Sequence, residues 1–244
     1  MKRIKFLNCN LDLLNIDETV NFIDDKIRRN QFIQQVVVNV AKIINLQKDA
    51  QLFKSVNDSD LINIDGMGII YGANFLKLDV KKEHKVSGID LFYSLINLSK
   101  DKGYKIFLLG ATEEVIKLTN DNLLSKYPNL KIAGYHHGYF WNDEEKIVQK
   151  IKNSGSQLLF VAITSPKKEN FINKWKKDLN VNFVMGVGGT FDIVAGKIKR
   201  APVWMQNNGL EWVYRIIQEP KRMWKRYLVT NTKYLLILIK EKLN

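Results

Sequence analysis

The sequence predicts an α/β fold in which a mostly parallel sheet is covered by helices on both faces. Two observations support this prediction. Apolar runs of strand length alternate with amphipathic stretches of helical length, and the later runs recur about every 25 residues, as repeated strand–helix units do. Parallel strands covered on both faces are nearly continuous in their apolar character, as these runs are. At 244 residues the chain is long enough to bury a sizeable core.

The expected elements follow one another with short connections. The valine-rich residues 35–40 predict a strand, and residues 41–53 predict an amphipathic helix. Residues 61–64 predict a short strand that ends at the Asp65-Gly66 turn, and helices are expected over 68–76 and 88–102. Four further strands, each followed by a helical stretch, are predicted at 104–109, 130–134, 158–163 and 181–187.

The carboxyl ends of these strands are the expected place for a ligand, as in other open α/β sheets. The loops concerned follow Asn39, Ile64, Leu109, Gly134, Ile163 and Val187.

The chain is basic, with a formal net charge of +13, and the excess is concentrated near its end. From Lys197 onward there are eleven Lys and Arg against three Glu. Such a surface favours nucleic acid, phosphorylated ligands or anionic lipid headgroups, and a merely soluble basic face is the alternative. We place a boundary near residue 200, with a catalytic core over 1–200 and a basic helical appendage over 201–244.

Several classes are excluded by composition. The single cysteine, Cys9, excludes an intrachain disulfide, and with only three histidines a Cys/His zinc site is not expected. The first residues lack the apolar segment of a signal peptide. The late apolar run at 234–239 is far shorter than the roughly 20 residues that span a bilayer. We therefore expect a cytoplasmic protein without a transmembrane anchor.

Asp65 is the candidate general base. It follows the apolar strand at 61–64 and precedes a glycine, so its carboxylate is expected at a strand tip. A carboxylate there abstracts a proton if burial raises its pKa toward the working pH. The alternative is an Asp that only forms the turn.

Two glycine-containing loops are candidate phosphate sites. Gly110-Ala111 and Gly188-Gly189 each follow an apolar run and can offer backbone N–H groups to phosphate oxygens. Asp192 is expected either to bind a ribose or base edge or to cap a turn. The aromatic tract around Tyr139 suits a nucleobase, and a half-buried aromatic loop is the alternative reading.

Asp58-Ser59-Asp60 has the DxD form of a metal site, but it precedes the strand at 61–64 and so lies at the wrong edge of the sheet. We therefore expect no metal and no cofactor, with Lys and Arg balancing the charge of a leaving group.

The chain resembles the bacterial WecG/TagA/CpsF glycosyltransferases over most of its length. The most specific match is the stretch GVGGTFDIVAGKIKRAPVWMQNNGLEWVYRIIQEPKRMWKRY, from Gly186 to Tyr227. Other matching segments are Asn39, Asp65 to Gly68, Val86 to Leu91, Phe107 to Gly110, His137 to Phe140, and Ser165 to Lys167 with Glu169.

The resemblance implies a Rossmann-like sheet and a metal-independent, inverting transfer of a sugar from a UDP-sugar to an undecaprenyl-diphosphate-linked sugar. Asp65 matches the base. The resemblance also implies a peripheral place at the inner face of the cell membrane, on an anionic surface. The positions that match nucleotide- and donor-binding residues are Asn39, Lys85, Gly110, Ala111, Tyr139, Lys168, Gly188, Gly189 and Asp192. The positions that match arginines for a diphosphate are Arg215, Arg222 and Arg226.

Three positions depart from the family pattern: Val37 replaces a threonine, Lys85 an arginine and Lys168 a glutamine. The cation at Lys168 leads to the hypothesis of a hexuronic acid donor, beside N-acetylmannosamine and related hexoses. Association into homo-oligomers stays open. The alternatives to an active transferase are a basic nucleic-acid-binding protein, a nucleotide-dependent oxidoreductase, and an inactive scaffold of the polysaccharide machinery.

Overall fold

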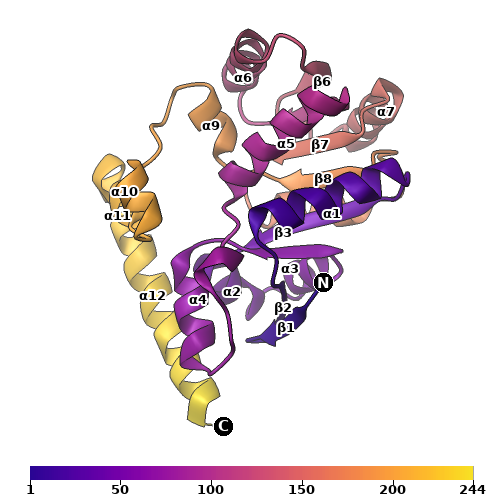
Figure 1. Cartoon of the computed structure of the whole chain (residues 1–244). Helices are drawn as coiled ribbons and strands as arrows, with labels where there is room; N and C mark the ends of the chain where they lie inside the picture. The colour runs from indigo at the N-terminus through magenta and orange to yellow at the C-terminus, as the bar shows by residue number, and fades with distance from the viewer. Residues whose placement is uncertain (244) are drawn as a thin grey trace.

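The computed structural model describes residues 1–243 and contains a six-stranded parallel sheet with helices on both faces (Figure 1). The strand order is β4-β3-β8-β7-β5-β6. This confirms the predicted fold class. The strands are β3 (Ile33–Val38), β4 (Leu61–Ile64), β5 (Lys105–Gly110), β6 (Lys131–His136), β7 (Leu158–Ala162) and β8 (Phe183–Gly186).

One predicted helix is wrong: residues 41–53 form two helices, α2 (Val40–Leu46) and α3 (Ala50–Asn57). The break has a local cause, since the Asp49 side chain accepts a hydrogen bond from the backbone N–H of Leu52 and so begins a new helix. The other predicted elements are present with small shifts at their ends. These include α4 (Met67–Phe75) and α5 (Gly88–Lys102). The short 3₁₀ helix η1 (Lys82–His84) between them was not predicted.

The N-terminal segment adds structure that the sequence did not predict. An antiparallel hairpin of β1 (Arg3–Phe6) and β2 (Cys9–Asp12) precedes α1 (Ile16–Arg28). The buried Asp12 carboxylate pairs with Arg3 at 2.7 Å and accepts a hydrogen bond from the Ile62 N–H at 2.8 Å. The hairpin thereby satisfies a donor on β4, which is an edge strand of the sheet.

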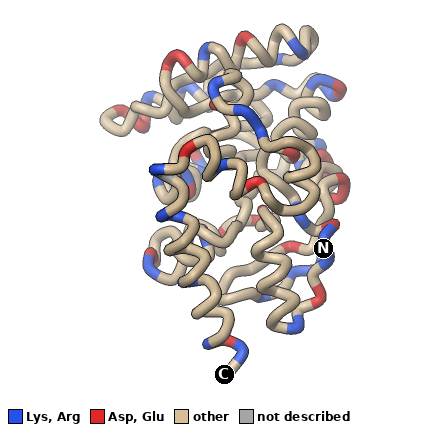
Figure 2. The backbone as a smooth tube through the Cα atoms, turned by 90° about the vertical axis from the view of Figure 1, so that its left-hand side faces the viewer, with Lys and Arg blue, Asp and Glu red and all other residues tan. Residues whose placement is uncertain are grey.

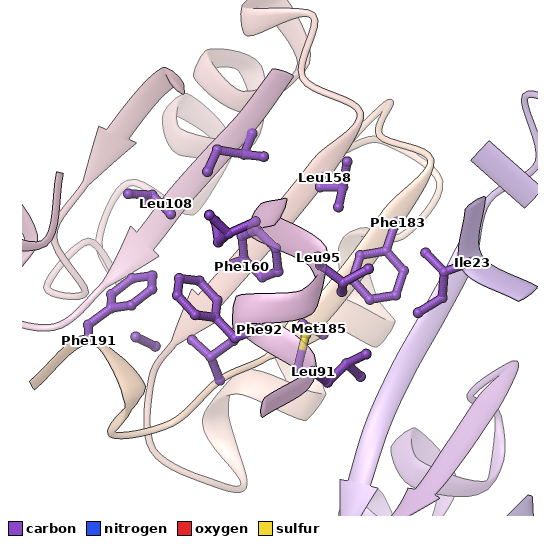
Figure 3. Close-up of a cluster of buried hydrophobic side chains, with 14 of the residues drawn as sticks. Ile23, Leu91, Phe92, Leu95, Leu108, Leu158, Phe160, Phe183, Met185 and Phe191 are labelled. Atoms are coloured by element: carbon purple, nitrogen blue, oxygen red, sulfur yellow. The ribbon is translucent and has the colours of Figure 1, made fainter. Parts of the chain in front are cut away.

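Successive side chains of each strand point to opposite faces, so the sheet has a core on each side. On β5, Ile106 and Leu108 join the cluster beneath α1, α5, α6 (Glu113–Lys126) and α9 (Thr190–Val194), drawn in Figure 3. Phe107 and Leu109 face the other side, beneath α7 (Glu144–Ser154) and α8 (Lys167–Trp175). Each fully buried side chain of this size stabilises the fold by roughly 1.5–3 kcal/mol.

The C-terminal part consists of α10 (Val203–Asn207), α11 (Glu211–Gln218) and α12 (Pro220–Leu243). Helix α12 begins at Pro220, and proline is favoured at the first position of a helix. Helix α12 runs alongside α2 and α4 (Figure 1). The Tyr234 hydroxyl donates to the Gly68 carbonyl at 2.9 Å, and a Cβ on Gly72 would collide with the Tyr234 ring. Within residues 1–243, none of the helices combines the length and apolar character that crossing a bilayer requires.

Candidate active site

Asp65 lies at the tip of β4, where the chain turns into α4. Its backbone N–H donates to the Val38 carbonyl at 2.8 Å, so the turn is tied to the end of the neighbouring β3. The residue as a whole keeps some exposure, but its carboxyl group lies in a desolvated position. Burial raises the pKa of Asp65 above its usual value, against the opposing charges of Arg215, Lys42 and Lys85. A half-buried carboxylate with a raised pKa is what a general base requires.

Asn39 orients this carboxylate from the end of β3. Its side-chain oxygen accepts a hydrogen bond from the Lys42 N–H at 3.0 Å and so caps α2. Its side chain also hydrogen-bonds Asp65, which lowers the pKa of that carboxyl and opposes the effect of burial. Because a carboxylate only accepts hydrogen bonds, the Asn39 amide nitrogen is the donor to Asp65, while its oxygen serves the cap. The cap thus fixes the orientation of a residue in the site.

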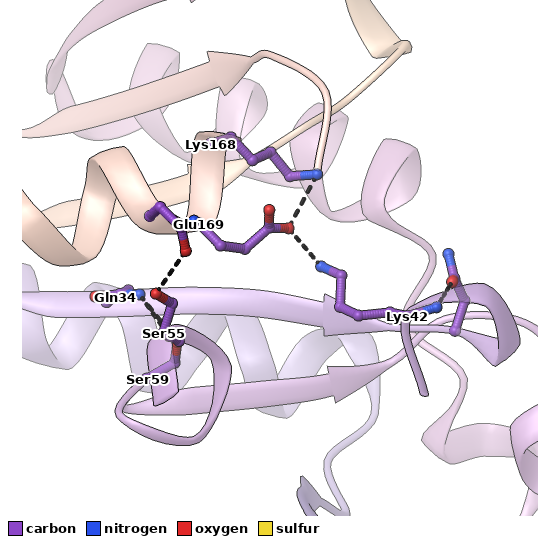
Figure 4. Close-up of polar contacts among 8 residues, drawn as sticks. Gln34, Lys42, Ser55, Ser59, Lys168 and Glu169 are labelled. Atoms are coloured by element: carbon purple, nitrogen blue, oxygen red, sulfur yellow. Dashed lines mark hydrogen bonds and ion pairs between the residues drawn. The ribbon is translucent and has the colours of Figure 1, made fainter. Parts of the chain in front are cut away.

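A buried ion cluster of Lys42, Glu169 and Lys168 (Figure 4) contributes charges that act on Asp65. Glu169 Oε1 is 2.7 Å from Lys42 Nζ and 3.1 Å from Lys168 Nζ. Burial alone would raise the pKa of Glu169, but the two ammonium groups outweigh it and hold the pKa at about 2. Burial and the charge of Lys42 lower the pKa of Lys168 to about 8. The negative charge of Asp65 also acts on Lys168, so two cations face two anions.

The loop at Gly110-Ala111 is shaped by a close approach between β5 and β7. Gly110 has a φ of 124°, and a Cβ there would collide with the Ala162 backbone. The Ala111 N–H donates to the Ala162 carbonyl at 2.9 Å, so it is already occupied within the protein. The Ala111 carbonyl accepts from the Gly138 N–H at 2.8 Å, which joins this loop to the one that carries Tyr139.

The loop after β8 keeps its backbone donors available. The N–H groups of Gly188 and Gly189 form no hydrogen bond within the described residues 1–243. Asp192 lies in the first turn of α9, and its Oδ2 would be 3.6 Å from a Cβ on Gly189. Tyr139 is 71% exposed, which leaves its ring open to a ligand.

Most predicted site residues fall into two groups along the edge of the sheet, and the loop after β8, with Gly188, Gly189 and Asp192, lies between them. Asp65 follows β4 and Tyr139 follows β6, at the two ends of the strand order. Five strand spacings of about 4.8 Å separate these strands, or about 24 Å. Asn39, Lys85, Lys168 and Arg215 belong to the Asp65 group, because their charges or hydrogen bonds act on it. Gly110, Ala111 and Tyr139 form the distant group.

The C-terminal helices reach the Asp65 group directly. Lys85 Nζ donates to the Gln206 carbonyl of α10 at 3.2 Å. Arg200 joins Asp90 of α5 at 2.6 Å to Glu211 of α11 at 3.8 Å. Arg215 and Arg226 are exposed, on α11 and α12 respectively. The side chain of Arg222 lies outside the described part of the structure.

Sequence reasoning did not assign Lys42, Glu169 or Glu211 to the site. A signal for Lys42 existed, since it stands three residues after a helix-capping Asn, in a helix otherwise dominated by apolar residues. Asp60 of the DxD segment accepts a hydrogen bond from the Gln34 N–H at 2.7 Å, at the amino end of the sheet, and so has a structural role. Within residues 1–243, no group of three or more His, Cys, Asp or Glu is arranged to hold a metal ion.

Comparison with known protein families identifies the family to which this chain belongs. The model of the glycosyl transferase WecG/TagA/CpsF family matches residues 4–244. The chain belongs to this family. It is therefore an enzyme, a glycosyltransferase, and the predicted family and reaction class are confirmed.

Characterised relatives share one name, N-acetylglucosaminyldiphosphoundecaprenol N-acetyl-beta-D-mannosaminyltransferase. The protein of Bacillus subtilis strain 168 is 33% identical over 247 residues, covering 99% of this chain and 91% of the relative. The protein of Staphylococcus aureus strain MW2 is 32% identical, covering 88% of this chain and 83% of the relative. That of Bacillus spizizenii strain W23 is 32% identical, covering 77% and 71%.

Proposed function

We propose that this glycosyltransferase moves a sugar from a UDP-sugar to an undecaprenyl-diphosphate-linked sugar by a single inverting displacement. The sugar is N-acetylmannosamine, its uronate or a related hexose, and the product enters cell-surface polysaccharide or teichoic acid synthesis. The names of the relatives support the lipid-linked acceptor and the amino-sugar class. The observation that carries the mechanism is Asp65 at a strand tip, bonded to Asn39 and faced by Arg215.

In the proposed step, the acceptor hydroxyl gives its proton to Asp65 while its oxygen bonds the anomeric carbon of the donor. The bond from that carbon to the β-phosphate oxygen breaks, and its electron pair leaves with UDP. Attack from the face opposite to the leaving group inverts the anomeric centre. The raised pKa of Asp65 makes it a stronger base than an exposed aspartate.

The charge of the departing diphosphate is balanced by side chains in this proposal, without a divalent metal. Lys85 acts on Asp65 and so lies close to where the bond breaks, and we assign Arg215, which also acts on Asp65, to the diphosphate of the lipid-linked acceptor. The free N–H groups at Gly188 and Gly189 are suited to a phosphate oxygen.

A lipid-linked acceptor is held in a membrane, and α12 carries the apolar and basic side chains that bind a membrane surface. Trp224 and Leu228 are exposed on it, beside the exposed cations Lys221, Lys225 and Arg226. Lys and Arg outnumber Asp and Glu along the C-terminal helices (Figure 2). We place this helix in the headgroup plane at the inner face of the cell membrane, where each cation contributes about 1 kcal/mol of attraction.

Asp65→Asn tests the mechanism. Loss of a general base typically costs about 10²–10⁴-fold in rate, whereas donor binding depends on other residues. We expect UDP affinity by calorimetry to be retained and turnover of lipid-linked acceptor to fall by that factor. Full turnover in Asp65→Asn would refute the assigned base. Activity abolished by EDTA and restored by manganese would refute metal independence.

A further inference from the structure

Helix α11 brings a carboxylate as well as an arginine to the Asp65 side of the site. Glu211 is the first residue of α11 and Arg215 follows four residues later. Side chains four apart in a helix lie on one face, with Cβ atoms about 5–6 Å apart. Arg215 acts on the Asp65 carboxyl, and the charge of Asp65 in turn raises the pKa of Glu211, so both side chains lie near the base. Gly209, two residues before α11, packs against Met67, two residues after Asp65.

The surroundings of Glu211 leave its carboxylate able to bind a ligand. Its side chain is 30% exposed, whereas that of Glu169 is 3% exposed and closed in by two lysines. Arg200 approaches Glu211 only to 3.8 Å, because its guanidinium is held by Asp90 at 2.6 Å. Within residues 1–243 the Glu211 carboxylate accepts no hydrogen bond from another residue. A carboxylate in this state has hydrogen-bonding capacity to spare.

The alternative is that Glu211 has a purely structural role and only stabilises the fold. An acidic residue in the first turn of a helix interacts favourably with the helix dipole, and its contact with Arg200 adds a partly exposed ion pair. Neither effect requires the carboxylate to lie beside Asp65. That juxtaposition sets two negative groups close together, which disfavours the charged form of both. A purely structural residue would not be expected at such a position.

We propose that Glu211 binds the acceptor sugar, its carboxylate accepting hydrogen bonds from pyranose hydroxyl groups. The proposal rests on the proposed function, in which Arg215 meets the lipid diphosphate and Asp65 the attacking hydroxyl. In a sugar 1-diphosphate the ring is attached directly to the phosphates. A diphosphate at Arg215 therefore sets the ring beside Glu211, one helical turn away and next to Asp65. Glu211 is thus a residue of the acceptor site that the C-terminal helices supply.

A second consequence concerns the pH dependence of the reaction. The negative charges of Asp65 and Glu211 repel each other, and this repulsion raises the pKa of Glu211. Removing the charge of Glu211 lowers the pKa of Asp65, so the acidic limb of the rate profile moves to lower pH. The other groups that face Asp65 stay in place in such a variant. They are Asn39 and Lys42 from α2, Lys85 before α5, Lys168 from α8 and Arg215 from α11.

Glu211→Gln in the full-length enzyme tests the proposal, with lipid-linked acceptor and UDP-sugar varied separately. We expect the KM for acceptor to rise about tenfold or more, as for loss of a charge-assisted hydrogen bond. We expect the acidic limb to move to lower pH and UDP affinity to stay unchanged. Glu211→Asp should recover part of the acceptor affinity. The matched control is Glu241→Gln, an exposed acid near the end of α12, which should change none of these quantities.

An acceptor KM and an acidic limb that both match the control would overturn the proposal. So would an equal loss of acceptor affinity, UDP affinity and thermal stability, because that pattern belongs to a structural residue. The outcome is separable from the test of the base. If Asp65→Asn kept full turnover, the proposed mechanism would fail, while a selective acceptor effect of Glu211→Gln would still place Glu211 in the acceptor site.

Discussion

The α/β core and the C-terminal helices differ in how many of their large apolar side chains are exposed. Among the described residues, six large apolar side chains are exposed in 1–202, against eleven in the much shorter stretch 203–243. The eleven are Val203, Trp204, Trp212, Ile217, Trp224, Leu228, Val229, Leu235, Leu236, Ile239 and Leu243. Exposed apolar surface of this extent is typical of a region that contacts a membrane or another protein.

The core and the C-terminal helices obtain their stability in different ways. The core buries apolar side chains on both faces of its sheet and even buries charged groups, which it pairs. The C-terminal helices keep both apolar and basic side chains at the surface, which suits a helix that lies against a lipid headgroup layer. Substitutions in the core should therefore change stability, and substitutions on the outer side of α12 should change binding while stability stays constant.

The largest effect is expected for the buried ion cluster. Removing one partner of a buried ion pair typically costs about 3–5 kcal/mol, so Lys42→Met should lower the free energy of unfolding by that amount. Urea unfolding followed by circular dichroism measures it. The matched control is Glu114→Gln, which breaks the exposed ion pair with Lys197 and should cost about 1 kcal/mol or less. Equal losses in the two variants would contradict the assignment of the stability to the core.

The same cluster gives stability a defined dependence on pH. The pKa of Glu169 is about 2 in the folded protein, below the usual glutamate value of 4.5. Its contribution is therefore fully present above about pH 4.5 and is lost as pH falls toward 2. Glu169→Gln should remove this part of the acid dependence. An unchanged slope of unfolding free energy between these pH values would show that Glu169 is not held ionised by the two lysines.

A smaller effect is expected on the outer side of α12. The double substitution Lys221→Gln with Lys225→Gln should weaken binding to phosphatidylglycerol vesicles by about 2 kcal/mol, or roughly 30-fold. The unfolding midpoint should stay constant, because both side chains are exposed. The matched control removes the exposed Lys117 and Lys152 of the core. If the control lost as much vesicle binding, attraction would depend on net charge and not on the C-terminal helices.

Lys168 tests whether the enzyme prefers a donor sugar that carries a carboxylate. Its ammonium lies 3.1 Å from Glu169, so part of its charge is already balanced inside the protein. If that cation also meets a donor carboxylate, Lys168→Gln should reduce turnover with UDP-hexuronic acids about tenfold relative to neutral UDP-sugars. Initial rates over a panel of both donor kinds measure this ratio. An unchanged ratio would remove the argument for an acidic donor.

The sheet was predictable because its strands are continuous apolar runs, and the strand at 61–64 needed no correction at either end. Asp65 was predictable for the same reason, since a polar residue after such a strand lies at the carboxyl edge. The contact between Lys42 and Glu169 was not predictable, because it joins residues 127 positions apart and depends on the packing of α2 near α8. The break at Asp49 was missed because its flanks keep helical periodicity, and only the cap reveals it.

The smallest effect concerns the boundary between the two regions. By sequence we placed Tyr234 in the appendage, yet its ring packs against Gly72 and its hydroxyl donates to Gly68 in the first turn after Asp65. Tyr234→Phe keeps the ring and removes only that hydrogen bond, so we expect a loss of about 1 kcal/mol, or about 2–4 °C in Tm. Tyr227→Phe, on the same helix, is the control and should cost less.

The stability of Tyr234→Phe shows which part of α12 belongs to the core and which part serves the membrane. A stability loss in Tyr234→Phe, with vesicle binding unchanged, would mean that the end of α12 belongs energetically to the core and only its beginning serves the membrane. Truncation after Arg200 would then expose Gly72 and Met67 and destabilise the core as well as abolish membrane attachment. A Tyr234→Phe variant that matched Tyr227→Phe in stability would instead favour an appendage that can leave the core as a unit.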